Sequence, residues 1–120
     1  MIKPTKGLVT EVYKRLIEKQ ENIISIKTYM DILEITYFYK KEKKITINKN
    51  IFEFAFKVKE WTEAQGFNLV SSTSFMGDGQ PTCMPVYKNG CEHPWIDADT
   101  EVEAIIKAGE WVLEQLKDKQ

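Results

Sequence analysis

The spacing of apolar residues along the chain changes several times, and each change predicts a new element of secondary structure. Residues 5–20 carry apolar side chains three or four positions apart, which is typical of an amphipathic helix. Between residues 23 and 47 the spacing falls to two, and β-branched and aromatic residues dominate. We therefore expect a helix followed by a meander of three strands, with residues 40–44 at a hairpin tip.

The lysines of residues 40–44 admit two interpretations. They can form an anion-binding patch, or they can form a solvated turn whose charges discourage other chains from pairing with the sheet. The sequence favours the solvated turn.

A second helix is predicted over residues 50–65. Asn50 and Glu53 have the spacing of a capping box, and Gly66 stands where a helix commonly ends. Three phenylalanines among residues 51–56 would also suit a strand. The cap, the glycine and the length of the segment favour the helix.

Strands are expected again after this second helix. Residues 67–75 alternate between apolar and polar side chains, and residues 84–88 form a shorter run of the same kind. Asn89-Gly90 is a strong signal for a two-residue hairpin turn, so residues 91–96 should return as a third strand.

The final helix is predicted to begin at a capping box formed by Thr100 and Glu103. Its inner face is marked by residues at helical spacing: Val102, Ile105, Ile106, Gly109, Val112, Leu113 and Leu116. The element order is therefore α-β-β-β-α-β-β-β-α, which predicts an α+β fold with about three helices covering an antiparallel sheet. At 120 residues, the chain is expected to form a single domain over residues 1–120.

The overall charge argues against broad nucleic-acid binding. The chain has 17 basic and 18 acidic residues, a formal charge of −1, and Arg15 is its only arginine. Sequence-specific DNA recognition favours arginine, so nucleic acid is not an expected partner. No apolar run is long enough to cross a membrane, and the first residues lack the apolar region of a signal peptide. We expect a cytoplasmic protein with no membrane partner and with reduced cysteines.

Residues 75–95 are the most informative part of the chain for function. They hold three of the four prolines, three of the six glycines, both cysteines and the only histidine. Such a segment leaves regular structure, and binding residues are often placed on irregular segments. Phe75 and Trp95 add aromatic side chains that suit a binding surface.

Gly77, Asp78 and Gly79 indicate a site for a small anionic ligand. Successive glycine-rich amides can form an anion-binding nest, to which Thr82 and Asn89 could add polar groups. A nucleotide-like ligand is one candidate, although neither a Walker A motif nor a dinucleotide-binding glycine motif is present. An ordinary structural turn explains the same glycines.

Cys83, Cys91 and His93 are the candidate metal ligands. Zinc accepts thiolate, imidazole and carboxylate groups, and Glu92 or Asp97 could supply a fourth ligand. The spacing lacks the close ligand pairs of common structural zinc sites, and the two cysteines could instead be free or form a disulfide. His93 could also serve as the base of a hydrolase, with a cysteine or a nearby serine as nucleophile. The sequence identifies no catalytic residue and predicts no cofactor.

The C-terminal helix carries a resemblance to a known class of proteins. Residues 97–106 give an acidic-Thr-Glu start to an alanine-containing helix, and residues 110–114 end it with a Trp-Val-Leu pattern. This pattern resembles the tails of short accessory proteins encoded by phages and integrated elements. The resemblance covers only this helix, carries no catalytic residue, and implies an accessory or host-interaction role.

Binding rather than catalysis is therefore the predicted function. The first hypothesis is a cytoplasmic accessory protein that contacts a protein partner through residues 75–95. The second is a binder of a small, nucleotide-like ligand, and the third is a metal-dependent or Cys/His hydrolase. An exposed sheet edge would also allow a homodimer.

Overall fold

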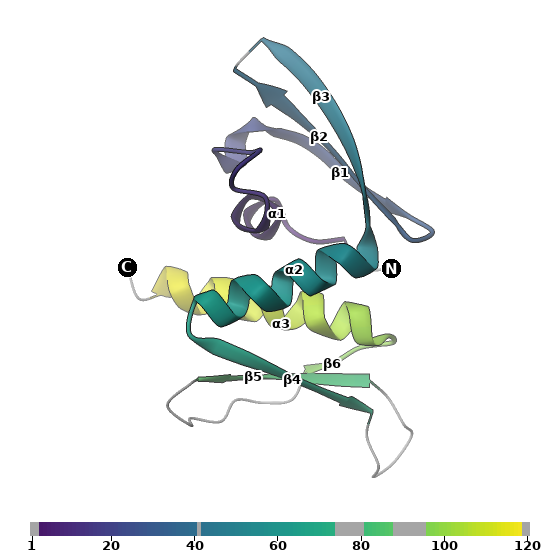
Figure 1. The fold of residues 1–120 in the computed structure, drawn as a ribbon, viewed down its shortest axis with the longest axis vertical. Coiled ribbons are helices and arrows are strands. Elements are labelled where there is room, and N and C mark those ends of the chain that lie inside the picture. The colour runs from purple at the N-terminus through teal and green to yellow at the C-terminus, as the bar shows by residue number, and fades with distance from the viewer. Residues whose placement is uncertain (1–2, 41, 74–80, 88–95, 119–120) are drawn as a thin grey trace. The chain divides into compact units, whose positions relative to one another are not determined.

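The computed structural model describes residues 3–40, 42–73, 81–87 and 96–118, and Figure 1 shows their fold. The contacts within the chain divide it into two compact units, Met1–Phe54 and Ala55–Gln120. In chain order the elements are α1 (Lys6–Val12), the 3-10 helix η1 (Gln20–Asn22), β1 (Ile23–Tyr29), β2 (Ile32–Tyr39), β3 (Lys43–Asn50), α2 (Ile51–Ala64), β4 (Phe67–Thr73), β5 (Pro81–Tyr87), β6 (Ile96–Asp97) and α3 (Glu101–Asp118). This order confirms the predicted α+β fold.

The strands of the described residues form two sheets. β1, β2 and β3 make one antiparallel sheet in chain order, and β4, β5 and β6 make the other. The sequence predicts an antiparallel sheet but not which strands are neighbours, because alternating apolar and polar residues mark strands and not their pairing. The single domain over residues 1–120 stays a prediction.

The core of the first unit lies on one face of the β1–β2–β3 sheet, called the inner face here. Alternate residues of the middle strand, Leu33, Ile35 and Tyr37, are at most 4% exposed. α1 lies beside this sheet (Figure 1), and its residues Leu8 and Val9 are fully buried. Removing these apolar side chains from water is the main force that holds the unit together.

The two edges of the first sheet differ. The register between β1 and β2 shifts by one residue between Ile23 and Ser25, so Ile24 is an extra, bulged residue on the edge strand β1. β3, at the other edge, pairs with β2 in unbroken register from end to end. A bulge makes an edge a poorer template for a further strand, so the two edges are not equivalent.

The predicted helix over residues 5–20 is wrong in length, because α1 ends at Val12. Tyr13 leaves helical geometry with a φ of −110° and a ψ of 40°, and its carbonyl accepts the backbone N–H of Leu16 in a turn. Thr10 and Val12 are β-branched, which lowers their preference for helix. The Thr10 hydroxyl also donates to a backbone carbonyl one turn earlier, a bond that often bends helices.

The second helix confirms the predicted cap and the predicted stop. Asn50 Oδ1 accepts the backbone N–H groups of Phe52 at 2.8 Å and of Glu53 at 3.3 Å. Residues 51–56 are therefore helical rather than extended. Gly66 follows with a φ of +97°, a conformation that is strained for any residue with a Cβ.

The second unit packs α3 against its sheet (Figure 1). The rings of Phe67 and Trp111 meet edge to face with their centroids 5.8 Å apart. Thr100 Oγ1 accepts the Glu103 N–H at 3.1 Å, which confirms the predicted cap. The predicted inner face of this helix is buried except at Leu116, which is half-buried.

The strands of the second unit follow the predicted order with different bounds. β5 begins at Pro81 rather than at residue 84, and the described part of the return strand is β6 alone. The predicted turn at Asn89 and Gly90 lies outside the described residues.

Replacing Asn50 by alanine tests the cap of α2. Asn50→Ala removes the acceptor of two backbone N–H groups, and loss of such a cap typically costs about 1 kcal/mol. We expect the free energy of unfolding, measured by urea denaturation, to fall by about this amount. Asn48→Ala, at an exposed position of β3, is the control and should change little. An Asn50→Ala variant as stable as the parent protein would contradict the capping role.

Replacing Met30 by glycine tests the strain in the turn between β1 and β2. Met30 has a φ of +53° and is 87% exposed, so its side chain gains little from packing. A left-handed backbone costs a residue with a Cβ about 1–2 kcal/mol, and the added freedom of an unfolded glycine offsets about half of that gain. We expect Met30→Gly to raise the free energy of unfolding by about 0.5–1 kcal/mol. Met30→Ala keeps the Cβ and should bring no gain; a less stable glycine variant would refute the strain.

Candidate functional site

Most residues of the predicted site lie outside the part of the chain that the structure describes. These residues are Phe75, Gly77, Asp78, Gly79, Asn89, Cys91, His93 and Trp95. The binding surface on residues 75–95, the glycine nest and the metal site therefore stay predictions. Within the described residues, no group of three or more His, Cys, Asp or Glu side chains is placed to hold a metal ion.

Thr82 and Cys83 are the predicted site residues whose backbone the structure does describe. Both lie in β5, the middle strand, which pairs there with β4 on one side and with β6 on the other. Their backbone groups belong to the sheet, so a ligand at this position would have to be bound by side chains. Asp97, a candidate fourth metal ligand, pairs with Thr82, and its backbone carbonyl accepts a hydrogen bond from Lys107 Nζ at 3.2 Å.

Charge is distributed unevenly between the two units. Met1–Phe54 contains 11 of the 17 basic residues and 7 of the 18 acidic residues, a net charge of +4. Ala55–Gln120 contains the other 6 basic and 11 acidic residues, a net charge of −5. The overall charge hides this division, which a separate count for each half of the sequence would have revealed. The first unit is therefore the one whose field attracts an anionic partner.

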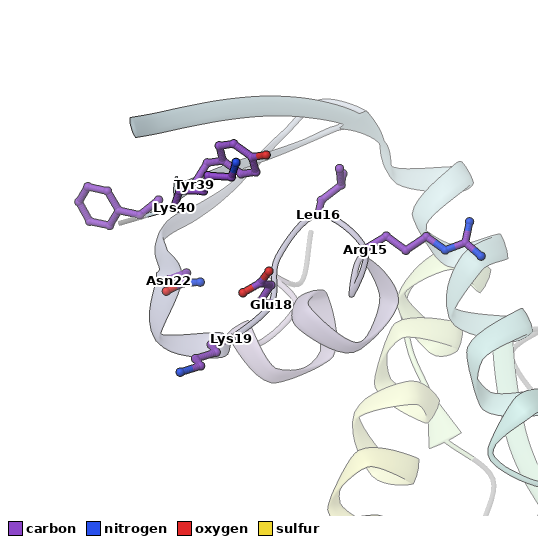
Figure 2. Close-up of a pocket in the computed structure, with 8 residues that line it drawn as sticks. Arg15, Leu16, Glu18, Lys19, Asn22, Tyr39 and Lys40 are labelled. Carbon is purple, nitrogen blue, oxygen red and sulfur yellow. The ribbon is translucent and has the colours of Figure 1, made fainter. Parts of the chain in front are cut away.

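The first unit has a pocket of about 320 Å³ between the turn after α1 and the end of β2 (Figure 2). Its polar lining consists of Arg15, Glu18, Lys19, Asn22 and Lys40. Three cationic side chains thus share the pocket with one carboxylate, and one of the three is the only arginine of the chain. None of these four charged side chains forms an ion pair with another described residue.

Large apolar side chains line the same pocket and remain open to solvent. Leu16 is 44% exposed, Phe38 is 41% exposed and Tyr39 is 45% exposed. A group of exposed apolar side chains bordered by charged residues is typical of an interaction surface. The pocket can therefore offer a ligand both electrostatic attraction and apolar contact.

Figure 2 shows how the polar groups of the pocket are arranged. Glu18 and Asn22 point toward one another across the pocket, whereas Arg15 points away from them. Lys40 Nζ lies 5.4 Å from the centre of the Tyr39 ring, in cation–π contact. The pocket thus combines separated cationic groups, an apolar wall and one inward-pointing carboxylate.

The pocket exists because the first helix stops early. The turn at residues 13–16 takes Leu16 away from the apolar face that a continuous helix would bury, and Arg15 lies in the same turn. At the end of β2, Lys40 has a φ of +52° and turns the chain toward β3. A continuous helix over residues 5–20 would have placed Leu16 on the buried face, so the sequence prediction missed this site.

A second hollow, of about 380 Å³, lies beside the edge strand β1 of the first unit. It is lined by residues 3–6 and 24–27, which include three lysines and no acidic residue. Thr5 Oγ1, in its lining, already accepts the Leu8 N–H at 3.2 Å as the cap of α1. This hollow has no aromatic side chain in its lining, so it offers charge with less apolar contact than the first pocket.

Tyr13 has a buried hydroxyl group next to the core of the first unit. Its side chain is 7% exposed, its ring centroid lies 5.9 Å from that of Phe54, and Lys49 Nζ lies 5.6 Å from its ring. No group among the described residues forms a hydrogen bond with Tyr13 Oη. Burial, followed by the negative charge of Glu53, raises the pKa of Tyr13 to about 12. The hydroxyl is therefore protonated near neutral pH and is poorly suited to acid–base catalysis.

Comparisons with known proteins find no match: no family model, no curated protein and no solved structure is similar to this chain. The resemblance of the C-terminal helix to phage-encoded accessory proteins stays a prediction. Among the helices of the described residues, none is both long enough and apolar enough to cross a membrane.

Replacing Tyr13 by phenylalanine tests the effect of the buried hydroxyl. Tyr13→Phe removes a buried polar group that has no partner among the described residues, and such a group typically costs about 1–3 kcal/mol. We expect the variant to be more stable than the parent protein at pH 7, by about 1 kcal/mol in urea denaturation.

The same variant should change the dependence of stability on pH. The folded pKa of about 12 lies above the ordinary value of 10.0, so the stability linked to the protonated hydroxyl is fully present below pH 10. It is lost as the pH rises through 12. Urea unfolding at a series of pH values between these limits should show a steeper loss for the parent protein than for Tyr13→Phe. Equal slopes would contradict burial of the hydroxyl.

Proposed function

We propose that the chain is a binding protein whose first unit, Met1–Phe54, holds an acidic segment of a protein partner. The observation that carries this proposal is the pocket in which Arg15, Lys19 and Lys40 stand beside exposed apolar side chains. The positive charge of the unit would attract the partner and orient it, and burial of the apolar surface would add affinity.

The chemistry of the pocket suits a peptide carboxylate better than a nucleic-acid backbone. Glu18 points into the pocket, where it would repel a ligand that carries an anionic group on every unit, as a nucleic-acid backbone does. A peptide can instead place one carboxylate near Lys40 and one apolar side chain against Leu16. The pocket lining contains no cysteine, serine or histidine, so it lacks a nucleophile–base pair and favours binding over catalysis.

The hypotheses drawn from the sequence stand beside this proposal. Residues 75–95 are proposed as a further contact surface for a protein partner, which fits a cytoplasmic accessory role. A nucleotide-like ligand at Gly77 to Gly79 and a Cys/His hydrolase centred on His93 are the alternatives. These three proposals rest on the sequence alone.

A labelled peptide of alternating glutamate and valine residues tests the pocket. We expect saturable binding by fluorescence anisotropy, and the affinity should fall as salt is raised. Arg15→Ala and Lys40→Ala should each weaken binding about two- to fivefold, the range of exposed ion pairs. Glu18→Gln should strengthen it, because it removes the one negative charge of the pocket.

Lys14→Ala is the matched control, since it lowers the net charge equally but lies outside the pocket lining. It should leave the affinity within about twofold of the parent protein. The proposal is wrong if Lys14→Ala weakens binding as much as Lys40→Ala does, or if Glu18→Gln weakens it. Tighter binding of single-stranded DNA than of the acidic peptide would contradict the proposal and indicate a nucleic-acid partner instead of an acidic protein segment.

A further inference from the structure

β3 is the open edge of the first sheet. No described strand pairs with its free side, and every residue of β3 is exposed or half-buried. Its pairing with β2 is unbroken, so the free side keeps the regular spacing of a strand. The opposite edge is interrupted by the bulge at Ile24 and has residues 3–6 beside it. An open and regular edge is a template on which a further strand can form.

The free hydrogen-bonding groups of β3 follow from the turn between β1 and β2. A two-residue turn makes Tyr29 and Ile32 a hydrogen-bonded pair. Hydrogen-bonded and non-hydrogen-bonded pairs alternate along a strand, so the odd-numbered residues of β3 bond to β2. The backbone N–H and C=O groups of Lys44, Thr46 and Asn48 therefore face the free side.

The charges of β3 select the kind of strand that can pair with it. β3 contains Lys43, Lys44 and Lys49 and no acidic residue. Two copies of β3 paired antiparallel about Thr46 would set Lys43 of one copy opposite Lys49 of the other, and like charges in this position are unfavourable. A strand that carries carboxylates meets no such repulsion. Charge complementarity therefore favours an acidic segment over a second copy of this chain.

The two faces of β3 specify the pattern of that segment. Lys44 and Asn48 are exposed on the outer face of the sheet, whereas Ile45 and Ile47 are half-buried on the inner face. Side chains of a neighbouring strand alternate between the same two faces. Carboxylates would then lie beside Lys44, and apolar β-branched side chains would lie beside the two isoleucines.

We propose that an extended segment of the partner, with alternating carboxylate and β-branched residues, pairs with the free edge of β3 as a fourth strand. This inference rests on the proposed function, because it gives the form in which the acidic partner binds the first unit. Backbone hydrogen bonds to Lys44, Thr46 and Asn48 give the affinity, and the alternation of side chains gives the specificity.

The alternating glutamate–valine peptide provides the test, with hydrogen exchange of backbone amides followed by NMR. On binding, the amides of Lys44, Thr46 and Asn48 should exchange at least about tenfold more slowly, because they gain hydrogen bonds. The amides of Ile45 and Ile47 already bond to β2 and should change little. A peptide N-methylated at alternate residues keeps its charges but cannot pair as a strand, and it should bind at least about tenfold more weakly.

Two substitutions at one position separate backbone pairing from side-chain contact. Asn48→Pro removes an N–H that faces the free side and leaves the bonds to β2 intact, whereas Asn48→Ala keeps that N–H. The proline variant should bind the peptide about tenfold more weakly, and the alanine variant should stay within about twofold. Lys44→Glu should weaken the acidic peptide and strengthen a lysine–valine peptide. Lys27→Glu, on β1, is its matched control.

The outcomes distinguish this inference from the proposed function. Peptide binding that responds to Lys40→Ala but leaves the amides of Lys44, Thr46 and Asn48 unchanged overturns strand addition alone. Slower exchange at these amides with no effect of Lys40→Ala supports strand addition and overturns the pocket. No binding overturns both. Dimerisation that slows the same amides without peptide shows that a second copy takes the edge, and it overturns the inference.

Discussion

One set of hydrogen bonds fixes the end of β3 and the start of α2. Asn50 is the last residue of β3, where it pairs with Ile32, and its side chain accepts two backbone N–H groups of α2. The N–H of Ile51 donates to the Asp31 carbonyl at 2.8 Å, in the turn between β1 and β2. The strand, the turn and the helix thus depend on the same few polar groups. Unpaired backbone groups are costly once buried, so these bonds hold the end of β3 at Asn50. The junction therefore also sets where the free edge of β3 ends.

The second constraint is the separation of charge between the two halves of the chain. At physiological ionic strength an exposed charge is screened within about 8 Å, so a ligand responds to the residues around it and not to the net charge of the whole chain. The pocket and the free edge of β3 both belong to the unit with a net charge of +4. A nearly neutral protein can therefore present a distinctly basic surface.

The sequence predicted those elements whose limits are set by local chemistry. α2 and α3 were predictable because Asn50, Thr100 and Gly66 act on the backbone within a few residues of themselves. The length of α1 was not predictable, because the pattern of buried apolar residues continues past the end of the helix. Tyr13 leaves helical geometry, yet Ile17 is still buried, with only 1% of its surface exposed. The spacing of apolar residues indicates which residues are buried, and here the buried residues continue from the helix into a turn.

The candidate site was less predictable than the fold. The pocket lies between residues 15–22 and residues 38–40, and no local sequence pattern predicts that these two segments come together. The lysines of residues 40–44 were a partial signal, since the anion-binding interpretation included Lys40. The strands of the two sheets were visible as alternating residues, but their pairing depends on contacts between distant segments. Most residues of the predicted site on residues 75–95 lie outside the described residues.

The bulge at Ile24 has a consequence for stoichiometry. A sheet with two open edges can accept strands on both sides, and chains that do so can join head to tail into filaments. In the first sheet only β3 pairs in unbroken register along its whole length, so strand addition is favoured at that edge. The irregular residue on β1 would thus favour one guest strand for each chain, at β3, over filaments that grow from both edges of the sheet.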